Sequence, residues 1–219
     1  MENVSNNNSQ KESLFYSLFF SSEEGTQNAI DLYEALSRKR VKNAQKINIE
    51  QDSSNQLSDF FFYKFDDRLV CFTEQQTISS TLPVRMFMSL GRAYDQLTMN
   101  DPRTRYGTKL YKIPSPDFYV LYNEDSELTT RELQLSDMFI ESSDSLQLKA
   151  EVVNIHTGAL KKSGMNKCKI LYEYSTVIEK AKEMGAENAV LYCNENDILA
   201  DYLQKHKTDI NSMLSYTVK

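Results

Sequence analysis

The chain has 219 residues, of which 40% are hydrophobic and 26% are charged, which is an ordinary globular composition. No apolar stretch approaches the length of a transmembrane span, so the sequence excludes a membrane-spanning helix and predicts no membrane partner. The net charge of −6 argues against a protein that coats nucleic acid, although an enzyme with clustered cations can be acidic overall.

The N-terminal segment is polar and lacks an apolar signal core. We therefore expect residues 1–12 to form a disordered lead-in on a cytoplasmic protein, and residues 13–219 to form one domain. The cysteines Cys71, Cys168 and Cys193 lie far apart and form no Cys-x-x-Cys pair. They predict reduced, buried thiols rather than a disulfide or a zinc site.

A helix is predicted over residues 26–36, because apolar side chains such as Ala29, Ile30 and Tyr33 recur at helical spacing. A basic run over residues 37–42 follows this helix. Cations are favoured at a helix C-terminus, but the same run could grip a DNA backbone. The sequence leaves both interpretations open.

Two runs rich in aromatic and β-branched residues, Phe60–Phe65 and Leu69–Phe72, predict a β-hairpin with a tight turn at Asp66-Asp67. In this register Phe61 faces Phe72. Directly opposed residues point to the same face of a sheet, so the register decides which side chains meet at the open end of the hairpin.

Two carboxylates meet at that open end, because continuing the register sets Asp59 opposite Glu74. Gln76 lies on the same face, one pleat further along. Opposed carboxylates repel each other unless a cation lies between them, and hard divalent cations bind clustered carboxylate oxygens. The hairpin therefore predicts a metal site, while a pair of solvent-exposed residues at the strand ends is the structural alternative.

The helix after the hairpin is predicted to begin near Pro83 and to run to about Leu97. Its predicted buried stripe contains Val84, Phe87, Leu90, Gly91 and Tyr94. A second stripe, on another face of the helix, contains Arg85 and Arg92.

The rest of the chain predicts further strands and helices, so we expect a mixed α/β sheet flanked by helices, with a helical C-terminal part. Two segments are predicted to be loops, Glu124–Glu132 and Gly158–Lys167. The predicted strands are Phe118–Tyr122 and Leu146–Ile155, and the predicted helices are Leu171–Met184 and Ile198–Tyr216.

Several segments taken together resemble a known family, and they occur in order between about Phe15 and Tyr216. They are AIDLYEAL, DDRLVCFTEQQTISSTLPVRM, IPSPDFYVLYN, LQLSDMFI, LYEYSTVIEKAKE and ILADYLQKHKTDINSML. The chain resembles the recombination-promoting nuclease / transposase family, a branch of the PD-(D/E)XK nuclease superfamily. The resemblance implies a restriction-endonuclease-like fold and magnesium- or manganese-dependent cleavage of DNA, associated with recombination or mobile elements in prokaryotes. A homodimer would let such a single-site nuclease cut both strands.

The family pattern has an Asp in the first hairpin strand and Glu-His-Gln-Ser-Thr in the second. An ungapped alignment from LPVRM sets Phe60 at the Asp and Thr73 at the Glu, which implies an inactive site. A shift of one residue on each side of the turn restores Asp59 and Glu74, with Gln76 at the Gln. A β-bulge could absorb that shift, and the sequence leaves both registers open.

In the active register, the resemblance implies that Asp59 and Glu74 ligate Mg²⁺ or Mn²⁺, which activates a water. The amide of Gln76 would orient that water without adding charge. Arg85 and Arg92 would contact DNA phosphates, unless they form a solvated helix face. The alternative function is a degenerate family member that binds DNA or a protein without cutting.

Overall fold

A mixed β-sheet forms the centre of the computed structural model, which describes residues 13–49, 59–99, 101–103, 107–126, 130–141, 143 and 145–217. The predicted lead-in, residues 1–12, lies outside these residues. Within the described part of the chain the sheet has six strands in the order β1-β2-β3-β4-β6-β5. Their bounds are β1 (Ala44–Ile47), β2 (Phe61–Phe65), β3 (Arg68–Glu74), β4 (Ser115–Tyr122), β5 (Thr130–Gln134) and β6 (Lys149–Asn154).

Strands β1, β2 and β3 pair antiparallel, whereas β4 runs parallel to β3 and β6 runs parallel to β4. Strand β5 closes the edge, antiparallel to β6. The helical elements are α1 (Leu14–Tyr16), η1 (Ser17–Ser21), α2 (Gly25–Ser37), α3 (Leu82–Thr98), η2 (Leu135–Met138), α5 (Thr157–Ser163), η3 (Met165–Lys167), α6 (Lys169–Met184), α7 (Ala186–Glu195), α8 (Ala200–Lys205) and α9 (Ile210–Thr217). The predicted mixed α/β sheet flanked by helices, with a helical C-terminal part, is therefore confirmed.

The β2–β3 hairpin has the predicted register, with Phe61 paired to Phe72. Asp66 opens the turn with a φ of 48°, in the left-handed region that Asp tolerates better than most residues. Its carboxylate also accepts hydrogen bonds of 3.1 Å from the backbone N–H groups of Lys42 and Asn43. These bonds tie the turn to the segment that leads into β1.

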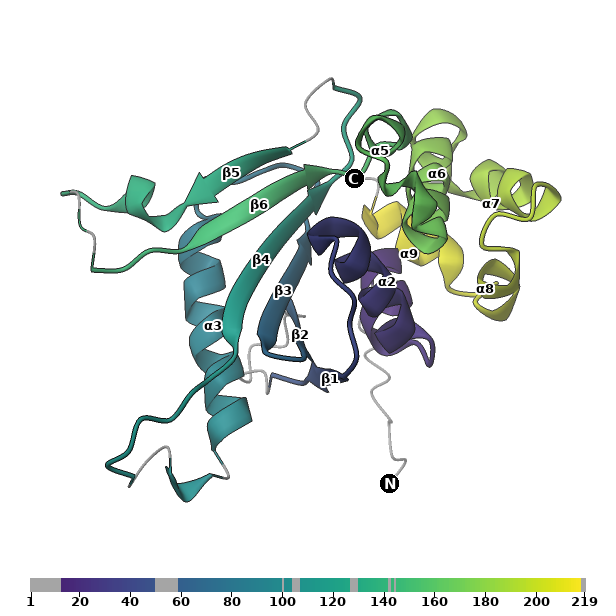
Figure 1. The fold of residues 1–219 in the computed structure, drawn as a ribbon. Coiled ribbons are helices and arrows are strands. Elements are labelled where there is room, and N and C mark those ends of the chain that lie inside the picture. Colours follow the sequence, from purple (N-terminus) through teal and green to yellow (C-terminus); the bar gives the residue numbers. More distant parts are fainter. Residues whose placement is uncertain are drawn as a thin grey trace, which may run out of the picture.

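The two faces of the sheet are covered differently, as Figure 1 shows. On one face, here called the helical-layer face, α1, η1, α2 and α6 cover Phe61, Tyr63, Phe65, Val70 and Phe72. On the other, here called the α3 face, α3 packs its Leu82 and Met86 against Phe62, Leu69 and Cys71. The period-2 alternation of a strand sends neighbouring residues of β2 and β3 to these two different layers.

The predicted start and length of α3 are confirmed, but the burial predicted for two residues of its stripe is wrong. Phe87 is 39% exposed and Gly91 is also exposed, whereas Met86 and Ala93 are fully buried. The helix is rotated so that the row beginning at Leu82 faces the sheet, which turns Phe87 toward solvent.

The C-terminal predictions are wrong in detail. Residues 158–167 were predicted as a loop, yet most of them lie in α5 and η3, and the predicted loop 124–132 ends in β5. The single helix predicted over residues 198–216 is two helices, α8 and α9, because the polar segment between them turns. Gly185, with a φ of 83°, separates α6 from the unpredicted α7.

The three cysteines are buried and free, as predicted. Among the described residues, no helix is both long and apolar enough to cross a membrane.

Candidate active site

The candidate site lies where β3 ends, beside the end of β4. Glu74, the last residue of β3, pairs with Leu121, and the N–H of Gln75 donates a 2.9 Å hydrogen bond to the carbonyl of Leu121. Because β3, β4 and β6 are parallel, their carboxyl ends meet at this edge of the sheet. Side chains that follow these three strands therefore lie close to Glu74.

Glu74 is half-buried and points to the helical-layer face, where the hydroxyl of Tyr174 from α6 donates a hydrogen bond to its Oε1. Burial raises the pKa of Glu74 to about 7, against the opposing effects of this hydrogen bond and of the Lys182 charge. Burial and the neighbouring Glu74 raise the pKa of Tyr174 as well. The Glu74 carboxyl thus changes its protonation state near neutral pH.

Lys182 and Asn123 add polar groups to this edge. The Lys182 Nζ donates a 2.8 Å hydrogen bond to the backbone carbonyl of Asn123, which directly follows β4. The side-chain Nδ2 of Asn123 is buried and meets no hydrogen-bond acceptor in the described part of the chain. A water or a ligand would satisfy this donor, since buried polar groups are nearly always hydrogen-bonded.

Gln76 also turns toward the helical layer, where its Nε2 donates a 2.8 Å hydrogen bond to the backbone carbonyl of Thr217 at the end of α9. Glu74 and Gln76 therefore both contact the C-terminal helices. The residue between them, Gln75, donates instead to the hydroxyl of Thr73, at 2.8 Å.

Asp59 has different surroundings. It forms a bend just before β2 begins, and its carboxylate pairs with Arg85 of α3. The Asp59 and Arg85 side chains are 47% and 41% exposed. The Arg85 guanidinium also lies 5.3 Å from the ring centre of Phe60, which packs against the α3 core. Asp59 thus lies on the α3 side of the hairpin end, and Glu74 lies on the opposite side.

The two registers proposed from the sequence place different side chains at the hairpin end. Phe60 and Thr73, the pair from the ungapped alignment, are both buried. Asp59 and Glu74 each lie two residues beyond the last hairpin pair, Phe61 and Phe72, and so at the same end of the two strands. No described contact joins the two carboxylates directly.

The remaining predicted residues lie further away. Arg92 is exposed on α3, two helical turns after Arg85. Glu34, a carboxylate on α2, pairs with Arg40 at 2.6 Å and accepts the Val41 N–H at 2.9 Å. These bonds fix the segment that follows α2, away from Glu74.

The sequence prediction missed Tyr174 and Lys182. Both lie in LYEYSTVIEKAKE, one of the segments that carried the family resemblance. That segment was therefore the available signal, but nothing in it indicated contact with a strand end a hundred residues earlier.

The donor types at this hairpin end suit a hard cation such as Mg²⁺, since they are two carboxylates and an amide. Glu74 Oε1 accepts from Tyr174, and the described residues offer its carboxylate no other hydrogen-bond donor. Among the described residues, Asp59 is held by one exposed ion pair, a kind worth less than about 1 kcal/mol. The described residues contain no ready-made group of three metal-binding side chains. The donor types thus suit the ion, while the two carboxylates lie on opposite sides of the hairpin end in this structure.

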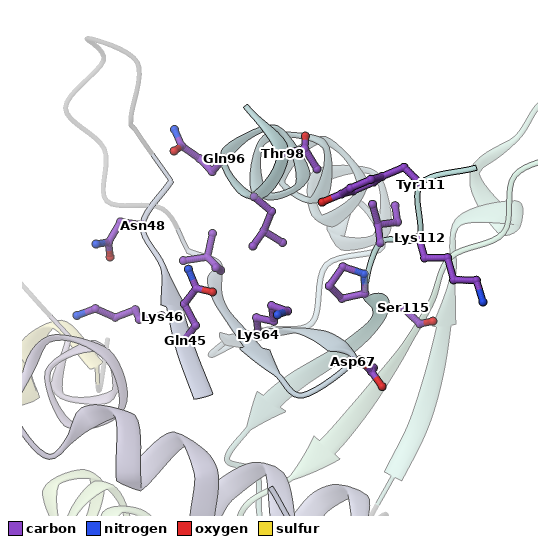
Figure 2. Close-up of a pocket in the computed structure, with 14 residues that line it drawn as sticks. Gln45, Lys46, Asn48, Lys64, Asp67, Gln96, Thr98, Tyr111, Lys112 and Ser115 are labelled. Carbon is purple, nitrogen blue, oxygen red and sulfur yellow. The ribbon is translucent and has the colours of Figure 1, made fainter. Parts of the chain in front are cut away.

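A separate hollow of about 820 Å³ lies near the opposite end of the hairpin, between β1, β2 and the C-terminal half of α3. Figure 2 shows Gln45, Lys64 and Tyr111 around it, whereas Lys46 and Lys112 point away. Lys46 instead donates to the carbonyl of Phe20, at 2.9 Å. The described lining of this hollow includes the carboxylate Asp67, but neither Asp59 nor Glu74.

Comparisons with known proteins return no match: no family model, no curated protein and no solved structure matches this chain. The family resemblance therefore remains a prediction.

Proposed function

We propose that this protein is a metal-dependent DNA endonuclease of the recombination-promoting nuclease / transposase type, with a restriction-endonuclease-like fold and a cytoplasmic, prokaryotic setting. The observation that carries the proposal is the half-buried Glu74 at the end of a central strand. It is followed on the same face by Gln76, and a helix begins soon afterwards at Leu82-Pro83. This order agrees with the family pattern in its shifted register.

In this proposal Asp59 and Glu74 hold Mg²⁺ or Mn²⁺, which when bound lowers the pKa of a water and stabilises charge on the phosphate. The Tyr174 hydroxyl orients the Glu74 carboxylate toward the ion. The contact with Thr217 fixes the amide of Gln76, which orients the attacking water. Lys182 lies near enough to lower the pKa of Glu74, so it supplies the positive charge that an amide lacks.

Arg85 has two roles in the proposed reaction. In the free protein it pairs with Asp59, and both side chains are well exposed. When DNA binds, a phosphate takes the place of Asp59 beside the guanidinium, a geometry that suits arginine. Asp59 would then be free to hold the ion. Arg92, two turns along the same helix, would contact a neighbouring phosphate.

A degenerate protein that binds DNA or a protein partner without cutting is the second candidate. One observation favours it: Asp59 pairs with Arg85 on the α3 side, whereas Glu74 contacts Tyr174 on the helical-layer side. The burial of Phe60 and Thr73 in the positions given by the ungapped alignment points the same way.

The test is cleavage of supercoiled plasmid in Mg²⁺ or Mn²⁺. We expect the parent chain to cut, and both Asp59→Asn and Glu74→Gln to lose at least about 100-fold in rate, because each removes a metal-binding charge. Asp95→Asn, an exposed carboxylate on α3, is the matched control and should cut like the parent. A parent chain that binds DNA but does not cut it would reject the nuclease in favour of the second candidate.

A further inference from the structure

A second charged surface lies away from the hairpin end, where α2 ends and α6 begins. A groove of about 460 Å³ separates these elements. Cations from two segments far apart in the sequence line it, and they define the basic groove: Arg38, Lys39, Arg40, Lys167 and Lys169.

The groove has the opposite charge to the chain, whose net charge is −6. Five cations face two carboxylates, and both carboxylates already have donors. Glu34 pairs with Arg40 and accepts the Val41 N–H, while Asp31 accepts a 2.8 Å hydrogen bond from Gln27. The groove therefore presents a net positive surface.

Most of these cations are available to a ligand. Arg38, Lys39 and Lys167 are exposed, and no ion pair joins any of them to another residue in the described ranges. Arg40 and Lys169 have partners, but their side chains are 91% and 83% exposed. Exposed ion pairs of this kind are weak and exchange readily for a more highly charged partner.

The backbone holds the two basic segments in a fixed arrangement. Arg38 caps α2 in the left-handed conformation, with a φ of 57°, so the chain turns sharply after the helix. Glu34 then holds Arg40 and Val41 by the two contacts described above. On the other side Gly164, with a φ of 77°, turns the chain from α5 into η3, which leads to Lys167. The groove is thus built from ordered elements.

One side of the groove belongs to the helix that contacts the candidate active site. Lys169 is the first residue of α6, and Tyr174, which contacts Glu74, lies five residues later on the same helix. Five residues correspond to a rise of about 7.5 Å along the helix axis.

We propose that the basic groove binds the phosphate backbone of DNA outside the hairpin end. This inference deepens the proposed nuclease function and rests on it for the identity of the polyanion. The hollow in Figure 2 is a weaker candidate for this role, since two of its lining lysines, Lys46 and Lys112, point away from it.

The test is binding of a fluorescent DNA duplex to the full-length protein in EDTA, followed by anisotropy over a range of NaCl concentrations. Lys39→Glu/Lys167→Glu should weaken binding at least about tenfold and reduce the slope of log K against log salt by about 1 to 2. Lys109→Glu/Lys112→Glu makes the same charge change on exposed lysines elsewhere and should weaken binding less than about threefold.

Equal binding by the groove variant and the parent would overturn the proposal, as would an equal loss in the control variant. No DNA binding by the parent chain, or equally tight binding of polyglutamate, would also reject DNA as the ligand.

If the charge reversal impairs folding, judged by circular dichroism, Lys39→Gln/Lys167→Gln must show the reduced salt slope. Glu74→Gln separates the two proposals, because it should keep DNA binding while losing cleavage. A parent chain that binds through the groove but never cuts would reject only the nuclease.

Discussion

Asp59 and Glu74 lie at the same end of one hairpin, yet their surroundings differ. The Asp59 side chain is exposed and pairs with an arginine. Glu74 is instead half-buried and contacts a tyrosine of the opposite layer. A carboxyl group in solvent keeps its charge at little cost, but one surrounded by protein must be hydrogen-bonded or protonated. The comparison indicates that the helical layer sets the chemistry of the site, while the α3 side supplies a partner that can be exchanged.

The largest expected effect concerns the pH dependence of stability. The pKa of Glu74 is about 7 in the folded protein and 4.5 ordinarily, so between these values the folded state holds a proton that the unfolded chain releases. Its contribution to the free energy of unfolding is greatest below pH 4.5 and is lost as the pH rises through about 7, by up to about 3 kcal/mol. Urea unfolding from pH 4.5 to 8 should detect it.

In that experiment Glu74→Gln should remove most of the decrease, because glutamine does not titrate. Asp59→Asn is the matched control at the exposed side of the hairpin end and should leave the decrease in place. The same decrease in parent and Glu74→Gln would show that burial does not control this carboxyl.

A medium effect is expected for Tyr174→Phe, which removes the donor to Glu74. The free energy of unfolding, measured with urea, should fall by about 1 to 2 kcal/mol at pH 8 and by less at pH 5. A hydrogen bond to a charged carboxylate is stronger than one to a protonated carboxyl. Tyr63→Phe is the control, since its hydroxyl donates to the neutral backbone carbonyl of Phe19 at 2.9 Å. The destabilisation caused by Tyr63→Phe should be the same at both pH values. An equal pH response in the two variants would contradict a hydrogen bond that depends on the charge of Glu74.

The smallest effect is expected for Arg85→Ala. The exposed ion pair of Arg85 with Asp59 and its contact with Phe60 should together contribute less than about 1 kcal/mol to the free energy of unfolding. Screening by 1 M NaCl should reduce that contribution. Arg68→Ala is the reference variant and should destabilise the protein more, because Arg68 is better buried and donates two hydrogen bonds to Asp117. A loss for Arg85→Ala as large as that for Arg68→Ala would mean that Asp59 is firmly held and unavailable to a metal.

Local sequence patterns were sufficient for much of the sheet. The aromatic runs and the Asp66-Asp67 turn predicted the hairpin and its register, because turn position and strand alternation together fix which residues pair. The start of α3 followed in the same way from a hydroxyl-rich segment before Pro83. These features depend only on residues close together in the sequence.

The surroundings of the site could not be predicted in this way. Glu74 contacts Tyr174 and Gln76 contacts Thr217, so each strand-end residue meets a helix at least a hundred residues later. Asp59 instead leaves the ladder and turns to α3, which the period-2 pattern did not indicate. The break between α8 and α9 was missed because their apolar residues continue a helical spacing through the turn.

The most direct test of the account is calorimetric titration of the protein with Mn²⁺ at pH 6 and pH 8. If Asp59 and Glu74 bind the ion together, the parent chain should bind about tenfold more tightly at pH 8, because the proton on Glu74 must leave. Asp59→Asn and Glu74→Gln should each abolish this binding. Absence of binding by the parent at pH 8, or binding that both variants retain, would contradict the claim that these two carboxylates form a metal site.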